Sequence, residues 1–284
     1  MPLFGHLLIL RKSKNLALLF FRFSQFVFFA EGRELIHGLH AIFNNTFLQT
    51  SYPLRFLSFM SHIELPLFSC QLVHQTALVD NIIELSLSRP EGFNWQVGDY
   101  LWLGSDQTDF KPFSIANLPT DSVIKLQVAI VPAMAQWLSH CLAQNPLQIK
   151  GSVSQYHWVE HQQSMILLAG GTGITPLLAL LQGHQQELMQ QSVTLYWGVR
   201  RSEHLFAQVA LDALSAHYPN FRWQAVVSDF DDNWTGLTGL LPDVLAQQSI
   251  DLTNHHILIC GPWPMVTALK SLVLSLGAKA ENIQ

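Results

Sequence analysis

The chain has 284 residues, a formal net charge of −5 and a hydrophobic content of 49%, with only 12% charged residues. This length is enough for two domains, each with its own core. The acidic balance and the lack of basic clusters argue against a nucleic-acid partner.

Residues 1–59 differ in composition from the rest of the chain. They hold 11 of the 18 phenylalanines and six Lys and Arg against two Glu (net +4), whereas residues 60–284 hold nine against eighteen acids (net −9). Basic residues interrupt the apolar segment, so it has no uncharged run of about 18 residues that could span a membrane. One interpretation is an interfacial membrane segment. The favoured one is an upstream reading-frame extension before Met60, with membrane contact only if the segment is native.

Residues 60–163 show the pattern of a small β-domain. Short strands are predicted at 68–75, 81–88, 98–104, 113–116 and 123–131, separated by turn residues, with one helix at 134–143. Even spacing of short strands is typical of an antiparallel barrel.

Residues 164–284 alternate between strand and helix. Strands are predicted at 165–169, 193–198, 222–227 and 256–260, and helices after Thr175 as far as 189 and at 205–216, 240–247 and 263–276. Alternation indicates crossover connections and a parallel sheet. The predicted fold is therefore α+β with two domains: an antiparallel β-barrel followed by an α/β domain. In such sheets ligands bind beyond the carboxyl ends of the strands.

The turn Gly170-Gly171-Thr172-Gly173 joins a buried strand to a helix. Glycines permit positive φ and let a ligand approach the main chain. Thr175 is predicted to cap the helix, and Pro176 suits its first turn. The helix start then presents unpaired N–H groups to an anion, so the turn predicts a phosphate site. Taken by itself, the turn also fits tight helix packing with no ligand.

Three further segments accompany this turn: Lys111-Pro112-Phe113-Ser114, Tyr196-Trp197-Gly198-Val199-Arg200 and Cys260-Gly261-Pro262. In this order the four segments resemble the ferredoxin-NADP reductase superfamily, and within it the bacterial NAD(P)H-flavin reductases. The resemblance covers residues 66–284 and none of 1–59. It implies a flavin-binding barrel over 60–163 and a NAD(P)-binding domain over 164–284, with the flavin ring between them.

The resemblance also implies which residues bind the two cofactors. On the flavin side these are Lys111, Pro112, Phe113 and Ser114 and the backbone of Gln127, Val128 and Ala129. On the coenzyme side they are Gly170, Gly171, Thr172, Gly173, Thr175, Pro176, Gly198, Arg200, Arg201, Cys260, Gly261 and Pro262. Ser114, facing flavin N5, and Cys260, beside nicotinamide C4, are the two catalytic candidates. Cys260 also fits a buried thiol that packs as a small hydrophobe.

Two departures from the family pattern bear on the flavin. Lys111 stands where the family usually has Arg, so a point charge replaces a planar fork. The barrel helix begins Val131-Pro132-Ala133, without the usual glycine and serine of a phosphate loop. The sequence therefore predicts a weakly held flavin (FMN, riboflavin or FAD). Arg200 and Arg201 fit contact with the adenosine ribose, contact with a 2′-phosphate or a solvated loop. With Ser202 they favour NADPH slightly, but both NADH and NADPH stay open as the coenzyme.

No metal site is predicted. The segment from His157 to His161 matches the H-x-x-E-H pattern of one group of zinc peptidases, but it falls at the domain junction. Cys70, Cys141 and Cys260 lie far apart in sequence and lack iron–sulfur spacing. Their odd number fits a reducing, cytoplasmic compartment.

The predicted function is hydride transfer from NADH or NADPH to flavin N5, with release of reduced flavin and a flavin-dependent acceptor protein as a further candidate partner. One alternative is a reductase component that keeps its flavin and passes electrons to a protein carrier. Another is a nucleotide-binding module without turnover. Family members usually continue beyond a position like Gln284 through a last strand, so the nucleotide domain is expected to be truncated.

Overall fold

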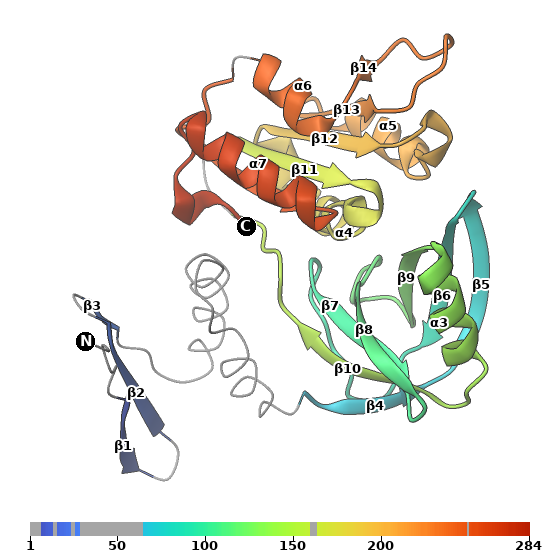
Figure 1. Ribbon diagram of the computed structural model, residues 1–284, viewed down its shortest axis with the longest axis vertical. Coiled ribbons are helices and arrows are strands. Elements are labelled where there is room, and N and C mark those ends of the chain that lie inside the picture. The colour runs from blue at the N-terminus through green and yellow to red at the C-terminus, as the bar shows by residue number, and fades with distance from the viewer. Residues whose placement is uncertain (1–6, 14–15, 24–25, 29–64, 160–163, 249) are drawn as a thin grey trace. The chain divides into compact units, whose positions relative to one another are not determined.

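A computed structural model describes residues 7–13, 16–23, 26–28, 65–159, 164–248 and 250–284 (Figure 1). The chain divides into two compact units, residues 1–64 and 65–284. In the first unit, β1 (Leu7–Ser13), β2 (Leu16–Phe23) and β3 (Phe26–Phe28) form an antiparallel sheet in that order. The proposed start at Met60 lies outside the described residues. Among the helices that are described, none is both long and apolar enough to cross a membrane.

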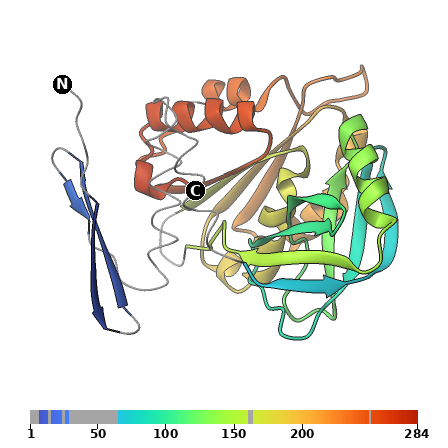
Figure 2. The ribbon, with the colours of Figure 1, turned by 60° about the horizontal axis from the view of Figure 1, so that its bottom comes forward.

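The second unit opens with seven strands in two antiparallel sheets. They are β4 (Leu67–Cys70), β5 (Leu72–Val79), β6 (Ile82–Ser88), β7 (Tyr100–Ser105), β8 (Thr108–Ser114), β9 (Val123–Ala129) and β10 (Leu147–Val153). The sheet orders are β4-β10-β7-β8 and β5-β6-β9. Figure 2 shows these strands, teal to light green, curving around a common centre. The predicted barrel is confirmed.

Three strands of the barrel differ from the predictions. The strand expected at 113–116 is β8, which begins earlier, at Thr108, and ends at Ser114. The strand expected at 68–75 is broken at Gln71 into β4 and β5, which belong to different sheets. β10 was not predicted, although Leu147 and Ile149 are buried between half-buried neighbours as in a strand. Pro146 before the strand and Gly151 within it are residues typical of loops. The alternation of buried and half-buried residues in β10 therefore did not lead to a strand prediction.

The core of the barrel comes from alternate strand residues and from one helix. Leu85 and Leu87 of β6 and Leu101 and Leu103 of β7 are fully buried, as expected when every second side chain faces inward. The helix α3 (Pro132–Leu142) adds Leu138 and Cys141 to the same cluster. This packing leaves the outward face of β9 for contacts with the following domain.

The rest of the unit is a parallel sheet with helices on both faces. Its order is β14-β13-β12-β11-β15. The strands are β11 (Ser164–Gly170), β12 (Val193–Val199), β13 (Phe221–Val227), β14 (Leu237–Thr238) and β15 (His255–Cys260). The helices are α4 (Ile174–Gly183), α5 (Gln208–His217), α6 (Leu241–Gln247) and α7 (Trp263–Ser275). The predicted α/β domain is confirmed.

Each face of this sheet has its own core. One cluster joins the sheet to α4 and α5, and another joins it to α6 and α7, and the two helix layers are seen in Figure 1. The helix expected to reach residue 189 ends at Gly183, and a short 3-10 turn, Glu187–Met189, follows. The domain boundary at 163 lies outside the described residues and stays a prediction.

The last residues of the chain run along β15. Ile283 forms a parallel bridge with Ile257. The N–H of Ile259 donates to the carbonyl of Gln284 at 3.0 Å, and the N–H of Gln284 donates to the carbonyl of Ile257 at 2.9 Å. These residues therefore extend the sheet beyond β15.

Candidate functional site

The glycine turn lies at the carboxyl end of the central strand β11. Gly171 has φ +54°, and a Cβ built there would have open space around it. Trp197 Nε1 donates to the carbonyl of Gly171 at 2.9 Å and holds the turn against β12. Gly173 is buried, and a Cβ there would collide with the Cys260 carbonyl. The turn therefore combines one glycine facing open space with one that permits close packing.

The Cys260-Gly261-Pro262 segment packs directly against this turn. In the sheet, Ala169 pairs with Cys260. A Cβ on Gly170 would lie 2.5 Å from the Met265 sulfur and 3.0 Å from Pro262. Two motifs 90 residues apart in sequence thus form one surface, and Gly170 and Gly173 are needed for that packing with or without a ligand.

Thr175 does not cap helix α4, contrary to the sequence prediction. The helix begins two residues earlier than predicted, at Ile174, with Gly173 as its N-cap residue and no side-chain cap. The Thr175 hydroxyl instead donates to Gln127 Oε1 at 2.7 Å, and Thr175 is only 2% exposed. Pro176 lies in the first helical turn as expected. The contact joins the nucleotide domain to β9 of the barrel.

The Lys111-Pro112-Phe113-Ser114 segment divides between the two faces of β8. Lys111 Nζ lies 5.5 Å from the Trp137 ring centre on α3, and the Phe113 and Trp137 ring centres lie 5.8 Å apart. Phe113 is buried in the barrel core. Pro112 is exposed and Ser114 is half-buried on the other face. Of the four predicted residues, Pro112 and Ser114 are therefore the ones whose side chains a ligand outside the core would meet.

Strand β9 offers main-chain groups beside Ser114. It pairs with β6 along its whole length, and its other side carries the isolated bridge between Leu126 and Ile115. Val128 points into the core, whereas Gln127 and Ala129 point outward. On the side of β9 that faces away from β6, no described strand pairs with residues 127–129.

Helix α3 starts without any side-chain cap. Its N-cap residue, Val131, is 57% exposed, and Pro132 occupies the first turn. No hydroxyl or glycine is present there to shape a loop around an anion. Helix α3 therefore begins with residues that differ from the glycine and serine of the family's phosphate loop.

Cys260 ends β15 as a half-buried thiol. Burial raises the pKa of this thiol to about 11, although a hydrogen bond with Tyr156 opposes the effect. The Tyr156 hydroxyl also donates to the carbonyl of Ile259 at 2.9 Å. At neutral pH the group is a neutral thiol, which suits packing or orientation and does not suit nucleophilic attack. Tyr156 was not identified from the sequence. It lies in the segment between β10 and β11, and only the fold brings this segment next to β15.

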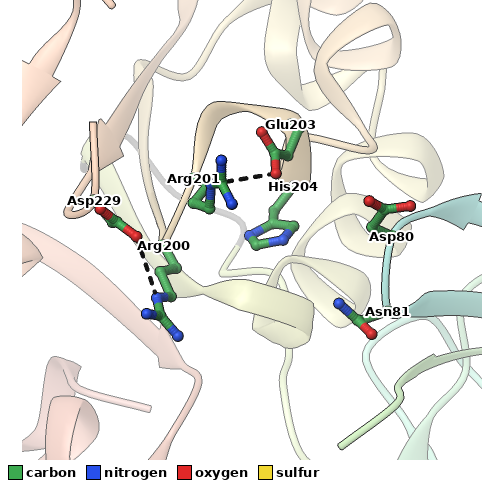
Figure 3. Close-up of a pocket in the computed structure, with 7 residues that line it drawn as sticks. All are labelled: Asp80, Asn81, Arg200, Arg201, Glu203, His204 and Asp229. Carbon is green, nitrogen blue, oxygen red and sulfur yellow. Dashed lines mark ion pairs between the residues drawn. The ribbon is translucent and has the colours of Figure 1, made fainter. Parts of the chain in front are cut away.

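Arg200 and Arg201 line a polar pocket of about 260 Å³ at the carboxyl ends of β12 and β13 (Figure 3). Arg200 Nε lies 3.6 Å from Asp229 Oδ2, and Arg201 Nε lies 3.3 Å from Glu203 Oε1. The other lining residues are Asp80, Asn81 and His204. Gly198, also predicted, lies at the end of β12. Sequence reasoning found the arginines but not the carboxylates around them.

The described residues contain no group of three side chains that could hold a metal ion. His157 is described, but His161 and the glutamate before it lie outside the described residues. The N–H of His157 donates to Gln284 Oε1 at 2.9 Å, and Gln284 Nε2 donates to the carbonyl of His157 at 3.2 Å.

Comparison with known proteins identifies both halves of the second unit. The FAD-binding domain family matches residues 67–175, and the oxidoreductase NAD-binding domain family matches residues 167–271. A probable flavin reductase of Photobacterium leiognathi is 27% identical over 217 residues, which cover 74% of this chain and 92% of that protein. A ferredoxin NADP+ reductase from Neisseria gonorrhoeae, solved with FAD and NADP, matches with a TM-score of 0.64 at 18% identity, over 74% of this chain and 92% of that one. The chain belongs to the ferredoxin-NADP reductase superfamily.

Other proteins similar to this superfamily member are parts of larger systems. The reductase component of the naphthalene 1,2-dioxygenase system of Pseudomonas putida is 27% identical over 205 residues, 71% of this chain and 62% of that protein. One subunit of the Na+-translocating NADH-quinone reductase of Pseudomonas aeruginosa is 26% identical, over 63% of this chain and 48% of that protein. The chain thus spans half to two thirds of these relatives. A cytochrome P450 reductase from Amycolatopsis shares the fold, with a TM-score of 0.70, 23% identity, and coverage of 78% and 69%.

These matches confirm an NAD(P)H-dependent oxidoreductase with one FAD-binding and one NAD-binding domain. The glycine turn fits the dinucleotide of this superfamily, because Gly171 leaves open space before the uncapped start of α4. The match to the FAD-binding domain family includes Ser114 and residues 127–129.

Proposed function

We propose that this chain is an NAD(P)H:flavin oxidoreductase that uses flavin as a substrate and releases it reduced. The contrast between the two helix starts carries this proposal, since only α4 follows a glycine turn that can receive a phosphate. The similarity to a flavin reductase over 92% of that protein's length supports it. When both partners are bound, the nicotinamide supplies a hydride that flavin accepts at N5.

The coenzyme pyrophosphate is assigned to the glycine turn and the N-terminal end of α4. Helix α4 spans ten residues, so its peptide dipoles add a partial positive charge at this end. The N–H of Ile174 is already bonded to the carbonyls of Gly171 and Thr172. The turn is therefore rigid before any ligand arrives, which lowers the entropy cost of binding.

The flavin ring is assigned to Ser114 and the main chain of Gln127 and Ala129. No side-chain hydrogen bond ties the Ser114 hydroxyl to another described residue, so it is free to donate toward N5. Lys111 is directed to Trp137 on α3. In this assignment the isoalloxazine ring is bound more tightly than the ribityl chain. Bound flavin is then expected to exchange readily with free flavin in solution.

Cys260 is assigned to the nicotinamide face as a neutral thiol, and Tyr156 is a positioning residue that fixes it. The chain contributes orientation and supplies no acid or base in this scheme. Cys70, Cys141 and Cys260 are all free thiols, which supports a reducing, cytoplasmic setting.

The test is to mix the full chain with FMN, riboflavin or FAD and to follow oxidation of NADH and NADPH. Catalytic oxidation with at least one flavin, in protein that does not retain stoichiometric flavin, is the expected result. A lack of acceleration by every flavin would refute the proposal, and coenzyme binding without oxidation would point to a nucleotide-binding module.

A reductase component that passes electrons to a protein carrier is the second candidate. The dioxygenase reductase component of Pseudomonas putida favours it, with 27% identity over 205 residues. This candidate requires tightly held flavin that survives gel filtration, and the absorbance spectrum of the purified chain decides the point.

A further inference from the structure

Strands β6 and β9 each contain one charged residue, and the two form an ion pair. Lys125 Nζ lies 3.0 Å from Glu84 Oε1. The assignments made above use neither side chain. Building on the proposed function, we propose that Lys125 stabilises the negative charge that the flavin acquires when it accepts hydride, and that Glu84 holds and moderates this lysine.

Lys125 lies on the same face of the barrel as Ser114. Ile115 and Leu126 form a bridge between β9 and the chain after β8, and both side chains are buried. In antiparallel pairing, the residues on either side of a buried pair point to the opposite face. Ser114 and Gln127 are therefore neighbours on the outward face. Lys125 is the diagonal neighbour of Ser114, at about 7–8 Å between Cα atoms, which a lysine side chain can bridge.

Hydrogen bonds fix this register. The N–H of Ala116 donates to the carbonyl of Lys125 at 2.8 Å, and the N–H of Lys125 donates to Asn117 Oδ1 at 2.8 Å. The Asn117 side chain is itself held, because its Nδ2 donates to the carbonyl of Val123 at 2.8 Å. Lys125 is thus anchored beside the segment that carries Ser114, which lowers the entropy cost of placing its side chain near a ligand.

The outward face of β9 meets the nucleotide domain. The Thr175 hydroxyl donates to Gln127 Oε1 at 2.7 Å. Thr175 comes two residues after Gly173, which packs against the carbonyl of Cys260. The face that carries Lys125 therefore lies towards the turn assigned to the coenzyme, from which hydride arrives in the proposed function.

Hydride transfer changes the charge of the flavin by one unit. The C4–H bond of the nicotinamide breaks, the hydrogen moves with both electrons to flavin N5, and an N5–H bond forms. NADH or NADPH is oxidised to NAD+ or NADP+, and the neutral flavin becomes an anion. A fixed ammonium attracts this anion more strongly than it attracts the neutral ring, so it favours the transfer.

Glu84 sets the strength of this effect. Its side chain is 17% exposed and that of Lys125 is 40% exposed, so the carboxylate lies deeper than the ammonium. The ammonium has further N–H donors that the pair leaves for a ligand. The carboxylate also offsets part of the lysine charge. Removing the charge of Glu84 should therefore raise the affinity for reduced flavin, whereas removing that of Lys125 should lower it.

The test compares the affinities of the full chain for oxidised and reduced riboflavin, by anaerobic calorimetry at mildly alkaline pH, where free reduced riboflavin is an anion. Riboflavin has no phosphate that could bind the lysine. Lys125→Gln should weaken binding of reduced riboflavin by about fivefold and leave that of the oxidised form unchanged. Lys125→Arg should retain the wild-type ratio. Glu84→Gln should tighten binding of reduced riboflavin by about twofold.

Lys279→Gln is the matched control, because it removes the same charge from an exposed residue away from the site. Lys279 comes two residues after Gly277, where a Cβ would lie 2.9 Å from Thr253 Oγ1, before the start of β15. It is therefore at the amino end of the parallel sheet, opposite the ligand edge. This variant should leave both affinities unchanged.

Equal weakening of both forms by Lys125→Gln would overturn the inference and mark a purely structural ion pair. So would the same shift in Lys279→Gln, weaker binding of reduced riboflavin by Glu84→Gln, or a wild type that does not bind reduced riboflavin. Riboflavin is reduced with dithionite, so the comparison needs no turnover. A selective shift in a chain that oxidises neither coenzyme would refute the proposed function alone, and turnover with an unchanged ratio would refute this inference alone.

Discussion

The two lobes of the second unit, the barrel and the parallel-sheet domain, each contain a helix that starts soon after a strand, and the two helix starts are built differently. Helix α4 follows a glycine turn, and its N-cap residue, Gly173, is buried against Cys260. Helix α3 follows Val131, which is 57% exposed, and begins with a proline. The start of α4 is shaped by the close packing of Gly173 against Cys260. The start of α3 has no side-chain cap and no glycine turn.

A helix dipole alone is therefore a weak basis for binding. Both helix starts lie at the positive end of a helix dipole, but only α4 is preceded by a glycine turn whose main chain a ligand can approach. A chain with one such turn is expected to hold one of its two partners by the phosphate and to release the other readily. If the two starts differ in this way, substitutions at the α4 turn should have the largest effects and substitutions at the start of α3 the smallest.

Replacing Gly173 by Val should destroy the turn at α4. The new side chain would overlap the Cys260 main chain, and overpacking of this kind costs about 3 kcal/mol. Urea unfolding should show that loss together with loss of NAD+ binding. Gly198→Ala is the stability control, because its Cβ would lie 3.4 Å from Leu241, an ordinary contact. Equal stability of the two variants would contradict this account of the turn.

Raising the pH should destabilise both lobes alike, because burial of thiols is common to both. Burial raises the pKa of Cys70 to about 12 and of Cys260 to about 11, from an ordinary value of 9.0. The unfolded chain releases these protons first, so stability falls as pH rises above about 9, by about 1 kcal/mol per thiol at pH 10. Unfolding midpoints from pH 8 to 10 check this, and Cys70→Ala should flatten the slope.

Removing the Thr175 hydroxyl should loosen the contact between the lobes. Thr175→Val leaves Gln127 Oε1 without its 2.7 Å partner and costs about 1 kcal/mol. A double-mutant cycle with Gln127→Leu isolates the pair. A coupling energy near zero would mean that the bond adds nothing in solution.

Installing a cap on α3 should have the smallest effect. Val131→Ser supplies the missing N-cap oxygen and should stabilise the chain by about 0.5–1 kcal/mol.

In the wild type, KM for FMN and for riboflavin should agree within about threefold, because the start of α3 has no glycine loop to bind the FMN phosphate. Steady-state kinetics with the two flavins measure this. A much lower KM for FMN would show that the barrel binds the phosphate by another route.

Local patterns predicted most of the fold, and contacts between distant segments could not be predicted. The glycine turn and the strand-helix alternation are visible in consecutive residues, so the sheet and its ligand edge followed from the sequence. The split at Gln71 depends on which strand each half pairs with. Likewise, Thr175 reaches Gln127, and Asp80 lines the same pocket as Arg200, only because the two lobes meet. When two segments are adjacent only in the folded structure, the sequence pattern of one does not indicate that it contacts the other.

The hydrogen bond from the Trp197 indole to the Gly171 carbonyl has a consequence for the fluorescence of the protein. This indole is fully buried and ends on the turn assigned to the coenzyme. Its emission should be blue-shifted, and reduced nicotinamide absorbs in that region, so energy transfer would quench it when the coenzyme binds. With Trp197→Phe as the reference for the other tryptophans, occupancy of the turn becomes measurable in unlabelled protein.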